Sequence, residues 1–484
     1  MAKSTSSVLT PDICIIGAGS GGLVVASAAA SFGVDVVLIE RHKMGGDCLN
    51  YGCVPSKAII AAAKHAHAIR EAPEFGVAAG DPKVNFKKVH SHIQGVIETI
   101  APMDSVERFE SLGVTVLQAN AEFSDAKTVV AGEHTIKARR FVVATGSAAF
   151  VPPIPGLDKI NYLTNETLFD QTRNPGHLLV IGGGPIGMEM AQAHHRLGAK
   201  VTVLEGAKAL GNDDPELTAI VLERLREEGI TILENTKVME VESLPKDKVR
   251  LHLEREEDGE KTTQTLDGDR VLVATGRAAS VEGLGLDKAG IDFTRRGIKV
   301  DKTMRTTNKR VYAIGDVAGG LQFTHVAGYH AGLVVRAILF RLKAKEDTHI
   351  IPWCTYTQPE LAHVGMDEKT AREKLGSGMT ILRWPYAEND RAQAEKTTTG
   401  LIKIITDKKG VICGVSIVGS MAGEMMNMWA LAITKKLKVR DITSYIPPYP
   451  TMSEIGKRAA TSYYADMPKK PFIRSVVKFL QKFG

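Results

Sequence analysis

Short runs of apolar residues alternate along this chain with longer stretches of helix-forming composition. Residues 13–16 form an unbroken apolar run, an alanine-rich stretch follows as far as Phe32, and residues 36–39 form a second apolar run. The same order returns over residues 177–204. Short apolar runs that alternate with helical stretches predict strand–helix–strand units and a parallel sheet. The pattern therefore predicts an α/β fold that contains two such units.

The first predicted strand runs into three glycines. Gly17 would make the tight turn, Gly19 would let the backbone approach a pyrophosphate, and Gly22 would allow close packing of helix on strand. The start of the helix would offer free N–H donors and a favourable dipole to the phosphates. Glu40 ends the second strand, where its carboxylate can accept hydrogen bonds from ribose hydroxyls. These features predict a dinucleotide-binding unit.

The second unit repeats this arrangement. Gly182, Gly184 and Gly187 take the three glycine roles, and Glu205 ends the following strand. A carboxylate at this position binds the 2'-hydroxyl of NAD and repels the 2'-phosphate of NADP. Only one cationic side chain, that of Lys208, lies close by in the sequence. We therefore expect NADH rather than NADPH.

Two cysteines, Cys48 and Cys53, lie between these units. In a regular helix, residues five apart are separated by about 7.5 Å along the axis and cannot form a disulfide, so the segment must depart from a regular helix to bridge them. Gly52 permits unusual backbone angles, and Pro55 suits a first helical turn. A helix start and the ammonium of Lys57 would favour the thiolate of Cys53.

The spacing of the pair is also compatible with two buried core cysteines or with half of a metal site. No second cysteine pair or histidine pair follows to complete a metal site, so we expect no bound metal. Cys14, Cys354 and Cys413 are interpreted as core residues. We favour a redox-active pair.

Composition narrows the class of protein. A length of 484 residues exceeds what one hydrophobic core fills, so three or four domains are expected. Hydrophobic residues make up 44% and charged residues 24% of the chain, which argues against disorder and against a bundle of membrane helices. The formal charge of +6 is modest and includes no basic block interleaved with aromatic residues, so we expect no nucleic-acid partner.

Three features predict a cytoplasmic protein. Residues 1–12 are polar and show no targeting signal. No uncharged apolar run reaches the roughly 18 residues that are needed to cross a bilayer. Five cysteines are few and odd in number, whereas a secreted disulfide framework would be dense and even.

Further motifs extend the comparison over nearly the whole chain. Residues 45–57 read GGDCLNYGCVPSK, residues 144–146 read ATG, residues 274–277 read ATGR, and residues 312–316 read YAIGD. The last third adds QPELAHVG at residues 358–365. Together with the two glycine-rich units, this set resembles the class I pyridine nucleotide-disulfide oxidoreductases.

The resemblance implies a fold and an order of domains. It implies an α/β fold with two Rossmann-like dinucleotide-binding domains, one for FAD and one for NAD, followed by an α+β dimerisation domain. The FAD-binding domain with the redox cysteines would span residues 1–151, the NAD-binding domain residues 152–280, a continuation of the FAD-binding domain residues 281–350, and the dimerisation domain residues 351–484. A homodimer is expected.

The resemblance also implies roles for single residues. Asp316 would bind the ribityl or phosphate side of FAD, and Lys57 would lie near flavin N5 and pair with Glu189 beside the nicotinamide. Electrons would pass from NADH through FAD to the Cys48–Cys53 disulfide, with Cys53 facing the flavin and Cys48 meeting the substrate. Further cofactor-binding positions implied by the motifs are Gly46, Thr145, Gly146 and Gly276.

One position departs from the pattern of the disulfide reductases in this family. They carry a histidine near the C-terminus, supplied by the partner subunit as a proton shuttle, with a glutamate after it. This chain has Tyr449 at the histidine position and retains Glu454. An unperturbed tyrosine, with a pKa near 10, is a poor proton shuttle at neutral pH.

Three functions remain open. The first is an NAD(P)H-dependent reductase of a small or protein-bound disulfide, similar to dihydrolipoamide dehydrogenase. The second is reduction of a thiol-bound metal ion or another small acceptor, similar to mercuric reductase, in which a tyrosine holds the metal. Residues 478–484 contain no cysteine pair of the kind that delivers metal in mercuric reductases, and we expect no N-terminal metal-binding domain. The third is a flavin-carrying binding subunit without turnover.

Two features stand outside this scheme. Residues 469–483 alternate apolar and cationic side chains and predict a basic amphipathic helix. We expect this helix to dock on the enzyme's own dimer, and contact with a membrane surface is the less favoured alternative. His325 lies where the family packs against the flavin, and both a core role and a tuning role are open.

Overall fold

The computed structural model describes residues 7–257 and 259–483, which form two compact units. Unit 1 comprises residues 7–206 and 233–346, and unit 2 comprises residues 207–232 and 347–483. The first six residues of the segment for which we predict no targeting signal lie outside the described residues, as do residue 258 of the predicted NAD-binding range and residue 484 of the predicted dimerisation range.

Unit 1 is built on a five-stranded sheet with the strand order β20-β8-β2-β3-β4, in which every neighbouring pair is parallel. The strands are β2 (Ile13–Ile16), β3 (Val36–Glu40), β4 (Thr115–Gln118), β8 (Arg140–Val143) and β20 (Val311–Ala313). All four residues of β2 are buried, because both faces of the sheet are covered. The unbroken apolar run in the sequence is explained by this double burial.

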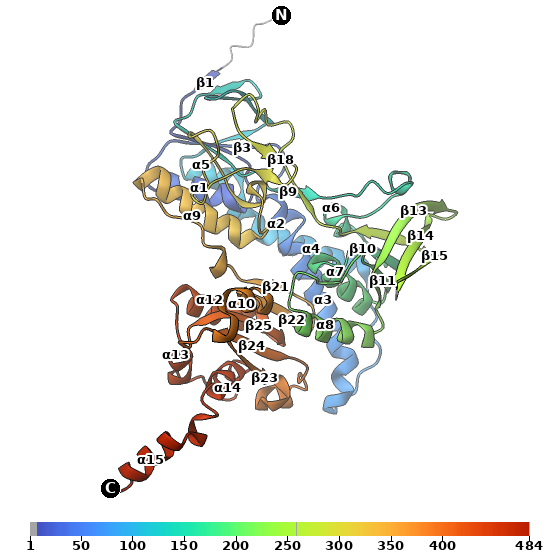
Figure 1. Cartoon of the computed structure of the whole chain (residues 1–484). Coiled ribbons are helices and arrows are strands. Elements are labelled where there is room, and N and C mark those ends of the chain that lie inside the picture. Colours follow the sequence, from blue (N-terminus) through green and yellow to red (C-terminus); the bar gives the residue numbers. More distant parts are fainter. Residues whose placement is uncertain (1–6, 258, 484) are drawn as a thin grey trace, which may run out of the picture. The chain divides into compact units, whose positions relative to one another are not determined.

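The two faces of the sheet are covered by different elements. Ile13 and Ile15 pack in one core with Val25 of helix α1 (Ser20–Ser31) and with helix α9 (Thr324–Phe340), and α1 and α9 lie side by side on this face (Figure 1). Cys14 and Ile16 point to the other face, which is covered by a small sheet. Its strands are β1 (Ser7–Leu9), β5 (Ala121–Asp125), β6 (Thr128–Ala131) and β7 (His134–Ile136).

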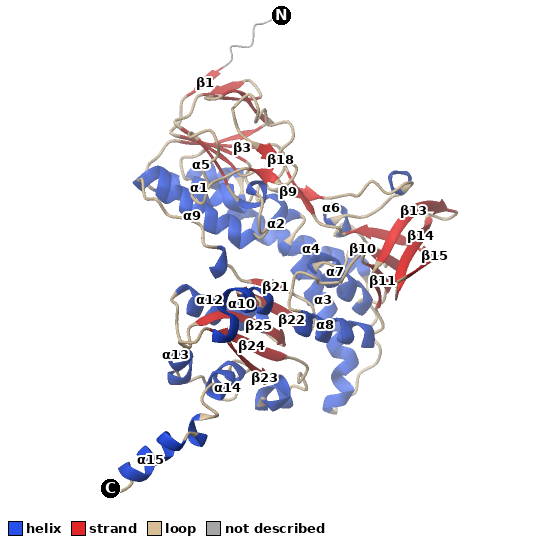
Figure 2. Cartoon of the chain, viewed as in Figure 1, coloured by secondary structure: helices blue, strands red, loops and turns tan. Residues whose placement is uncertain are grey.

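A second parallel sheet in unit 1 has the same design. β10 (His177–Ile181) lies between β11 (Lys200–Leu204) and β16 (Arg270–Val273), and helix α7 (Pro185–Arg196) follows β10. An antiparallel three-stranded sheet packs its apolar side chains against Leu179 and Ile181 of β10, and Figure 2 shows these as long neighbouring strands. They are β13 (Thr236–Leu244), β14 (Lys248–Glu257) and β15 (Glu260–Gly268).

The chain passes between the two parallel sheets on a pair of short strands. β9 (Ser147–Ala149) leaves the first sheet, and β17 (Arg277–Ala279) runs antiparallel beside it where the chain returns. The other elements of unit 1 are α2 (Gly46–Asn50), α3 (Cys53–Glu71), α4 (Phe86–Ile100), α5 (Val106–Ser111), α6 (Asn165–Leu168), β18 (Phe293–Thr294) and β19 (Gly297–Ile298).

Unit 2 is built on a five-stranded antiparallel sheet with the order β21-β22-β25-β24-β23. Its strands are β21 (Trp353–Thr355), β22 (Glu360–Gly365), β23 (Thr380–Pro385), β24 (Leu401–Thr406) and β25 (Ile412–Gly419). The buried indole of Trp429 on α12 (Ala422–Thr434) shares its core with the sheet and with α14 (Glu454–Ser462). The remaining helices are α8 (Pro215–Glu227), α10 (Glu368–Leu375), α11 (Asp390–Ala394), α13 (Val439–Ser444) and α15 (Pro471–Leu480).

Helix α8 falls within the range predicted for the NAD-binding domain but packs on the sheet of unit 2. The buried ammonium of Lys403 lies 2.7 Å from a carboxylate oxygen of Asp214, the N-cap of α8, and 2.9 Å from Glu216. Glu368 completes this ring of carboxylates. A buried ammonium costs several kcal/mol unless it is paired, and these contacts supply the pairing.

No helix among the described residues is both long enough and apolar enough to span a bilayer.

Candidate active site

The two central cysteines lie on two helices that meet at a break. α2 ends at Asn50, α3 begins at Cys53, and Gly52 is the N-cap between them. This is the interruption that the five-residue spacing predicts. Both cysteines are thiols in this structure, and Cys48 donates a hydrogen bond to the Cys53 sulfur.

The two thiols differ in acidity. The hydrogen bond from Cys48 lowers the pKa of Cys53 to about 6, aided by the hydroxyl of Thr324 and the ammonium of Lys57. The same hydrogen bond, together with burial, raises the pKa of Cys48 well above its ordinary value. The pair therefore ionises at Cys53 first, and Cys48 keeps its proton. At neutral pH the thiolate is on the residue at the start of α3, where the helix dipole also favours it.

Lys57 and Glu189 form an ion pair one helical turn after Cys53. The ammonium lies 2.7 Å from a carboxylate oxygen of Glu189, whose side chain is buried. Lys57 belongs to α3 and Glu189 to α7, the helix that follows the second glycine-rich turn. The ion pair thus joins the cysteine helix α3 to α7, the helix of the second predicted nucleotide-binding segment, within unit 1.

A polar network holds the segment that carries Cys48. The carboxylate of Asp47 lies 3.2 Å from the guanidinium of Arg277 and accepts a 2.9 Å hydrogen bond from Asn165. Arg277 also donates to the hydroxyl of Ser147 at 2.7 Å, and Ser147 in turn donates to Asp316. Burial raises the pKa of Asp316. The network connects the cysteine segment to the strand ends of the first sheet.

Several of these residues were not predicted as site residues. Asp47 lies in the GGDCLNYGCVPSK motif and Arg277 in the ATGR motif, but no role follows for them from sequence alone. Thr324, whose hydroxyl oxygen lies 3.4 Å from the Cys53 sulfur, directly precedes His325 in the sequence. The His325 ring is exposed, so it is not a core histidine, and it stacks on Phe323 with ring centroids 5.4 Å apart.

The first glycine-rich unit leaves a bare stretch of backbone. A Cβ on Gly46 would lie 2.7 Å from the Cα of Gly19, so no side chain fits between these two backbone segments. The N-cap of α1, Gly19, offers no capping side chain to the first N–H groups of the helix. Glu40 accepts hydrogen bonds from the backbone N–H groups of Ala18 at 2.7 Å and His42 at 2.8 Å. A phosphate and a ribose fit this combination of uncapped N–H donors and an oriented carboxylate.

The second glycine-rich turn, which also lies in unit 1, repeats this local geometry. A Cβ on Gly187 would lie 2.0 Å from the carbonyl oxygen of Gly182, as one on Gly22 would lie 1.9 Å from that of Gly17. The space beside the Cα of Gly184 is open within 4 Å, and this N-cap likewise has no capping side chain. Glu205 accepts a 2.7 Å hydrogen bond from the N–H of Gly183.

The remaining predicted cofactor residues lie at the ends of the parallel strands. Gly146 follows β8 and Gly276 follows β16, both with positive φ and with nothing within 4 Å of a built Cβ. Thr145 donates from its hydroxyl to the carbonyl oxygen of Ser280 at 2.8 Å, which anchors this loop to the returning chain. The carboxyl ends of parallel strands are where nucleotides bind in open α/β sheets. The residues present therefore fit two dinucleotides.

Tyr449 and Glu454 lie in unit 2. The phenol of Tyr449 is 69% exposed and donates a 2.9 Å hydrogen bond to Asp390. This hydrogen bond raises the pKa of Tyr449 above its ordinary value, and the charge of Glu454, at the start of α14, adds to the effect. The tyrosine is therefore held as a neutral hydrogen-bond donor at neutral pH.

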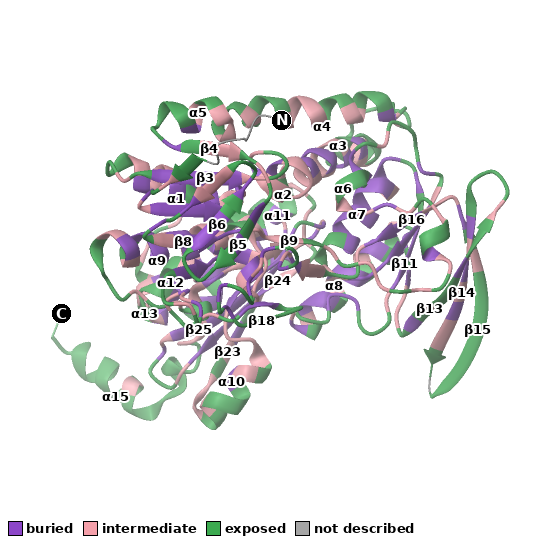
Figure 3. Ribbon diagram, turned by 90° about the horizontal axis from the view of Figure 1, so that it is seen from above, coloured by how far each residue is buried: buried purple, intermediate pink, exposed green. Residues whose placement is uncertain are grey.

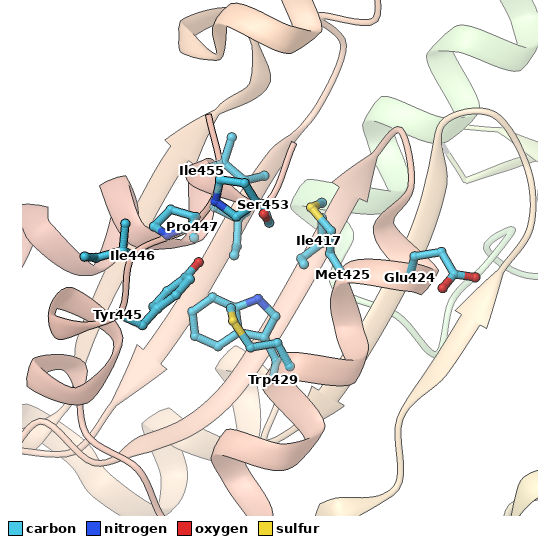
Figure 4. Close-up of a pocket in the computed structure, with 13 residues that line it drawn as sticks. Ile417, Glu424, Met425, Trp429, Tyr445, Ile446, Pro447, Ser453 and Ile455 are labelled. Carbon is cyan, nitrogen blue, oxygen red and sulfur yellow. The ribbon is translucent and has the colours of Figure 1, made fainter. Parts of the chain in front are cut away.

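An apolar cavity of about 430 Å³ lies close to this segment in unit 2. Figure 4 shows Trp429 and Met425 of α12 on one side of the cavity and Tyr445 and Pro447 on the other. Nearby, Ile446 is almost wholly exposed. Exposed apolar side chains of this size beside a cavity are typical of a surface that another protein chain covers.

Comparison with known proteins identifies the family. A family model described as pyridine nucleotide-disulphide oxidoreductase matches residues 11–331, and the model of the dimerisation domain of that family matches residues 351–460. The chain belongs to the pyridine nucleotide-disulphide oxidoreductase family. It is accordingly an NAD(P)H-dependent flavin disulfide oxidoreductase, with two nucleotide-binding domains and a C-terminal dimerisation domain.

Two groups of relatives match over most of the chain. A mercuric reductase of Streptomyces lividans is 34% identical over 476 residues, which covers 95% of this chain and 97% of the relative. A dihydrolipoyl dehydrogenase of Geobacillus stearothermophilus is 34% identical over 460 residues, covering 92% and 94%. The Cu(II) complex of the HOCl-induced flavoprotein disulfide reductase RclA from Escherichia coli superposes with a TM-score of 0.82 at 28% identity, covering 93% of this chain and 99% of that chain.

These matches confirm the predicted family, fold class and enzyme class. FAD and a nicotinamide nucleotide follow from the family, as does dimerisation, and the interpretation as a binding subunit without turnover falls away.

The acidity of Cys53 can be measured by alkylation. In the reduced enzyme, the rate of Cys53 alkylation by iodoacetamide should rise with pH with a midpoint near 6, because the thiolate is the reactive form and predominates above its pKa. The Cys48→Ala variant, which lacks the donor to Cys53, should shift the midpoint upward. The Cys413→Ser variant is the matched control and should leave it unchanged. A wild-type midpoint near the ordinary thiol value of about 8.5 would contradict this assignment.

Proposed function

We propose that this enzyme uses NADH to reduce the Cys48–Cys53 disulfide and that the resulting thiol pair reduces a small acceptor. FAD, when bound, supplies the two-electron relay between nicotinamide and sulfur. The observation that carries the proposal is the 2.7 Å ion pair of Lys57 and Glu189. It fixes the helix of the cysteines against the helix of the second nucleotide unit, which is the arrangement that such a relay requires.

The proposed domain order is the one that the family resemblance implies. Residues 1–151 and 281–350 form the FAD-binding domain, residues 152–280 the NAD-binding domain, and residues 351–484 the dimerisation domain. β9 and β17 pair with each other just before residues 151 and 280, respectively. This pairing supports the boundary where the chain enters the NAD-binding domain and the boundary where it returns to the FAD-binding domain. Gly17, Gly19, Gly22, Glu40 and Gly46 serve FAD, together with Thr145, Gly146 and Asp316. Gly182, Gly184, Gly187, Glu205 and Gly276 serve NADH.

The chain's own residues manage protons and charge. Reduction of the disulfide by two electrons gives two sulfurs, of which Cys53 is held as the thiolate and Cys48 as the thiol. Lys57 stabilises the Cys53 thiolate and is itself held by Glu189. Asp47, fixed by Arg277 and Asn165, orients the segment that presents Cys48. Cys48 is therefore the sulfur that meets the acceptor.

A disulfide acceptor is the first candidate. Thiol–disulfide exchange needs the Cys48 sulfur as a thiolate, so its proton must pass to a base. The dimerisation domain supports a homodimer. In that dimer, Tyr449 of one protomer would take the place of the base that receives the Cys48 proton of the other. A phenol whose pKa is raised by Asp390 is a poor acceptor for that proton.

A thiol-bound metal ion is the second candidate, and this property of Tyr449 favours it. A soft metal ion deprotonates the thiol that coordinates it, so no protein base is needed. The O–H of Tyr449 is donated to Asp390, so in the proposed dimer its phenol oxygen would offer a lone pair to the bound ion. The relatives include mercuric reductases, and a structural neighbour is the Cu(II) complex of a flavoprotein disulfide reductase, which agrees with this class of acceptor.

Electron uptake tests the central proposal. In an anaerobic titration with NADH, the holoenzyme should take up about two electrons per protomer beyond those held by FAD and should develop the long-wavelength absorbance of a thiolate against the flavin. Cys53→Ser should abolish both signals, while Cys413→Ser, a matched cysteine in unit 2, should retain them. Persistence of the absorbance in Cys53→Ser would show that the role given to this residue is wrong.

Glu205 should set the choice of nucleotide. The Glu205→Ser variant removes the carboxylate that repels a 2'-phosphate, so its kcat/KM with NADPH relative to NADH should rise about tenfold. The ratio is measured on one preparation, which cancels any general loss of activity. A wild-type enzyme that uses NADPH as well as NADH would refute the preference.

Tyr449 should set the acceptor. With NADH as donor, the wild-type enzyme should reduce Hg(II) or Cu(II) faster than lipoamide or glutathione disulfide. Tyr449→His should raise turnover of the disulfides about tenfold or more, because imidazole can take the Cys48 proton near neutral pH. Tyr449→Phe, the matched control, should give no such gain. Rapid lipoamide turnover by the wild type would contradict the argument from Tyr449.

A further inference from the structure

Helix α15 (Pro471–Leu480) separates apolar and polar side chains from Phe472 onward. At about 100° per residue, its apolar side chains and Phe483 just beyond it fall in one arc of about 160°. The apolar face consists of Phe472, Ile473, Val476, Val477, Phe479, Leu480 and Phe483. The remaining arc holds Arg474, Ser475, Lys478, Gln481 and Lys482.

The apolar face is exposed. No residue of α15 is buried among the described residues, and Phe472 is 75% and Phe483 72% exposed. Figure 3 shows α15 as exposed along almost its whole length. Other amphipathic helices of this chain behave differently, since α8 buries Leu217 and Val221. No described residue of this chain buries the apolar face, so we look for a partner molecule that would cover it.

The charge of this segment is unusual. Residues 467–484 contain four lysines and one arginine but no aspartate or glutamate, so they account for five of the six net positive charges of the chain. An amphipathic helix that docks on a protein turns its polar face to solvent, where mixed charges are favoured and a single sign causes self-repulsion. A polar face of one sign is instead attracted to the headgroups of anionic lipids.

We propose that α15 lies in the surface of a bilayer that contains anionic phospholipid. Its two phenylalanines, its leucine and the adjoining Phe483 would enter the boundary between headgroups and acyl chains. Lys478 and Lys482 would reach the phosphates. The helix lies parallel to the membrane, because it is too short to span a bilayer of about 30 Å. It lies beyond residue 460, where the match to the dimerisation-domain model ends, so this surface is not part of the region matched to the family. The enzyme would thus work at a membrane surface.

Vesicle flotation of the holoenzyme tests this proposal. The wild type should float with vesicles of equal parts phosphatidylcholine and phosphatidylglycerol, remain unbound with phosphatidylcholine alone, and bind at least about tenfold less at high salt. Phe472→Ser with Phe479→Ser should lose binding to the anionic vesicles. Lys478→Glu with Lys482→Glu should lose it as well. Both variants should keep the NADH-dependent activity of the wild type, because none of the proposed catalytic or nucleotide-binding residues lies in α15.

Matched controls separate the helix from general effects. Phe75→Ser removes an exposed phenylalanine elsewhere, and Lys408→Glu with Lys409→Glu makes the same charge change on an exposed turn of unit 2. Both should bind vesicles like the wild type. The proposal is overturned if the wild type does not float with anionic vesicles or if the tail variants float as well as the controls. It is also overturned if Phe472→Ser with Phe479→Ser changes the oligomeric state in gel filtration, because α15 would then dock on a second copy.

Discussion

The ion pair of Lys57 and Glu189 is the contact on which the geometry of the active site depends. Lys57 follows Cys53 by one helical turn, and Glu189 follows the second glycine-rich turn by one. One 2.7 Å contact therefore sets the distance between the sulfur pair and the second nucleotide unit. The carboxylate of Glu189 is buried, and a buried charge is costly without its partner, so the pair resists separation. Redox centres that exchange electrons or hydride need such a fixed spacing, which flexible linkers between domains could not give.

Much of this arrangement follows from local sequence, and the remainder depends on contacts that are distant in sequence. The apolar runs, the glycine spacings and the acidic strand ends act within about thirty residues, so the two nucleotide units and the helix break between Cys48 and Cys53 could be predicted. The network of Asp47 with Arg277 joins residues that are far apart in the sequence. The spacing of apolar residues along the chain cannot predict a contact between two such distant polar residues. The hydroxyl of Thr324 beside Cys53 was missed for the same reason, because nothing local distinguishes it from any threonine at the start of a helix.

Hydrogen bonds give the two sulfurs and Tyr449 complementary properties. The bond between the thiols lowers the pKa of Cys53 and raises that of Cys48, so one sulfur is ready to carry charge and the other still holds its proton. The bond to Asp390 raises the pKa of Tyr449. An outer thiol that keeps its proton exchanges slowly with a disulfide unless a base removes that proton. Acceptors that displace the thiol proton themselves, as soft metal ions do, escape this constraint.

Placement of the enzyme is a separate physical problem from its chemistry. The two units bury their apolar side chains in cores, as the cores of α1 with β2 and of α12 with β25 illustrate. Helix α15 does the opposite, since it collects large apolar side chains on one exposed face and positive charge on the other. Neither feature alone selects a partner, because apolar faces dock on proteins and basic faces bind many anions. Their combination on one short helix selects an interface that is apolar on one side and anionic on the other, and the surface of a bilayer with anionic lipid has this structure.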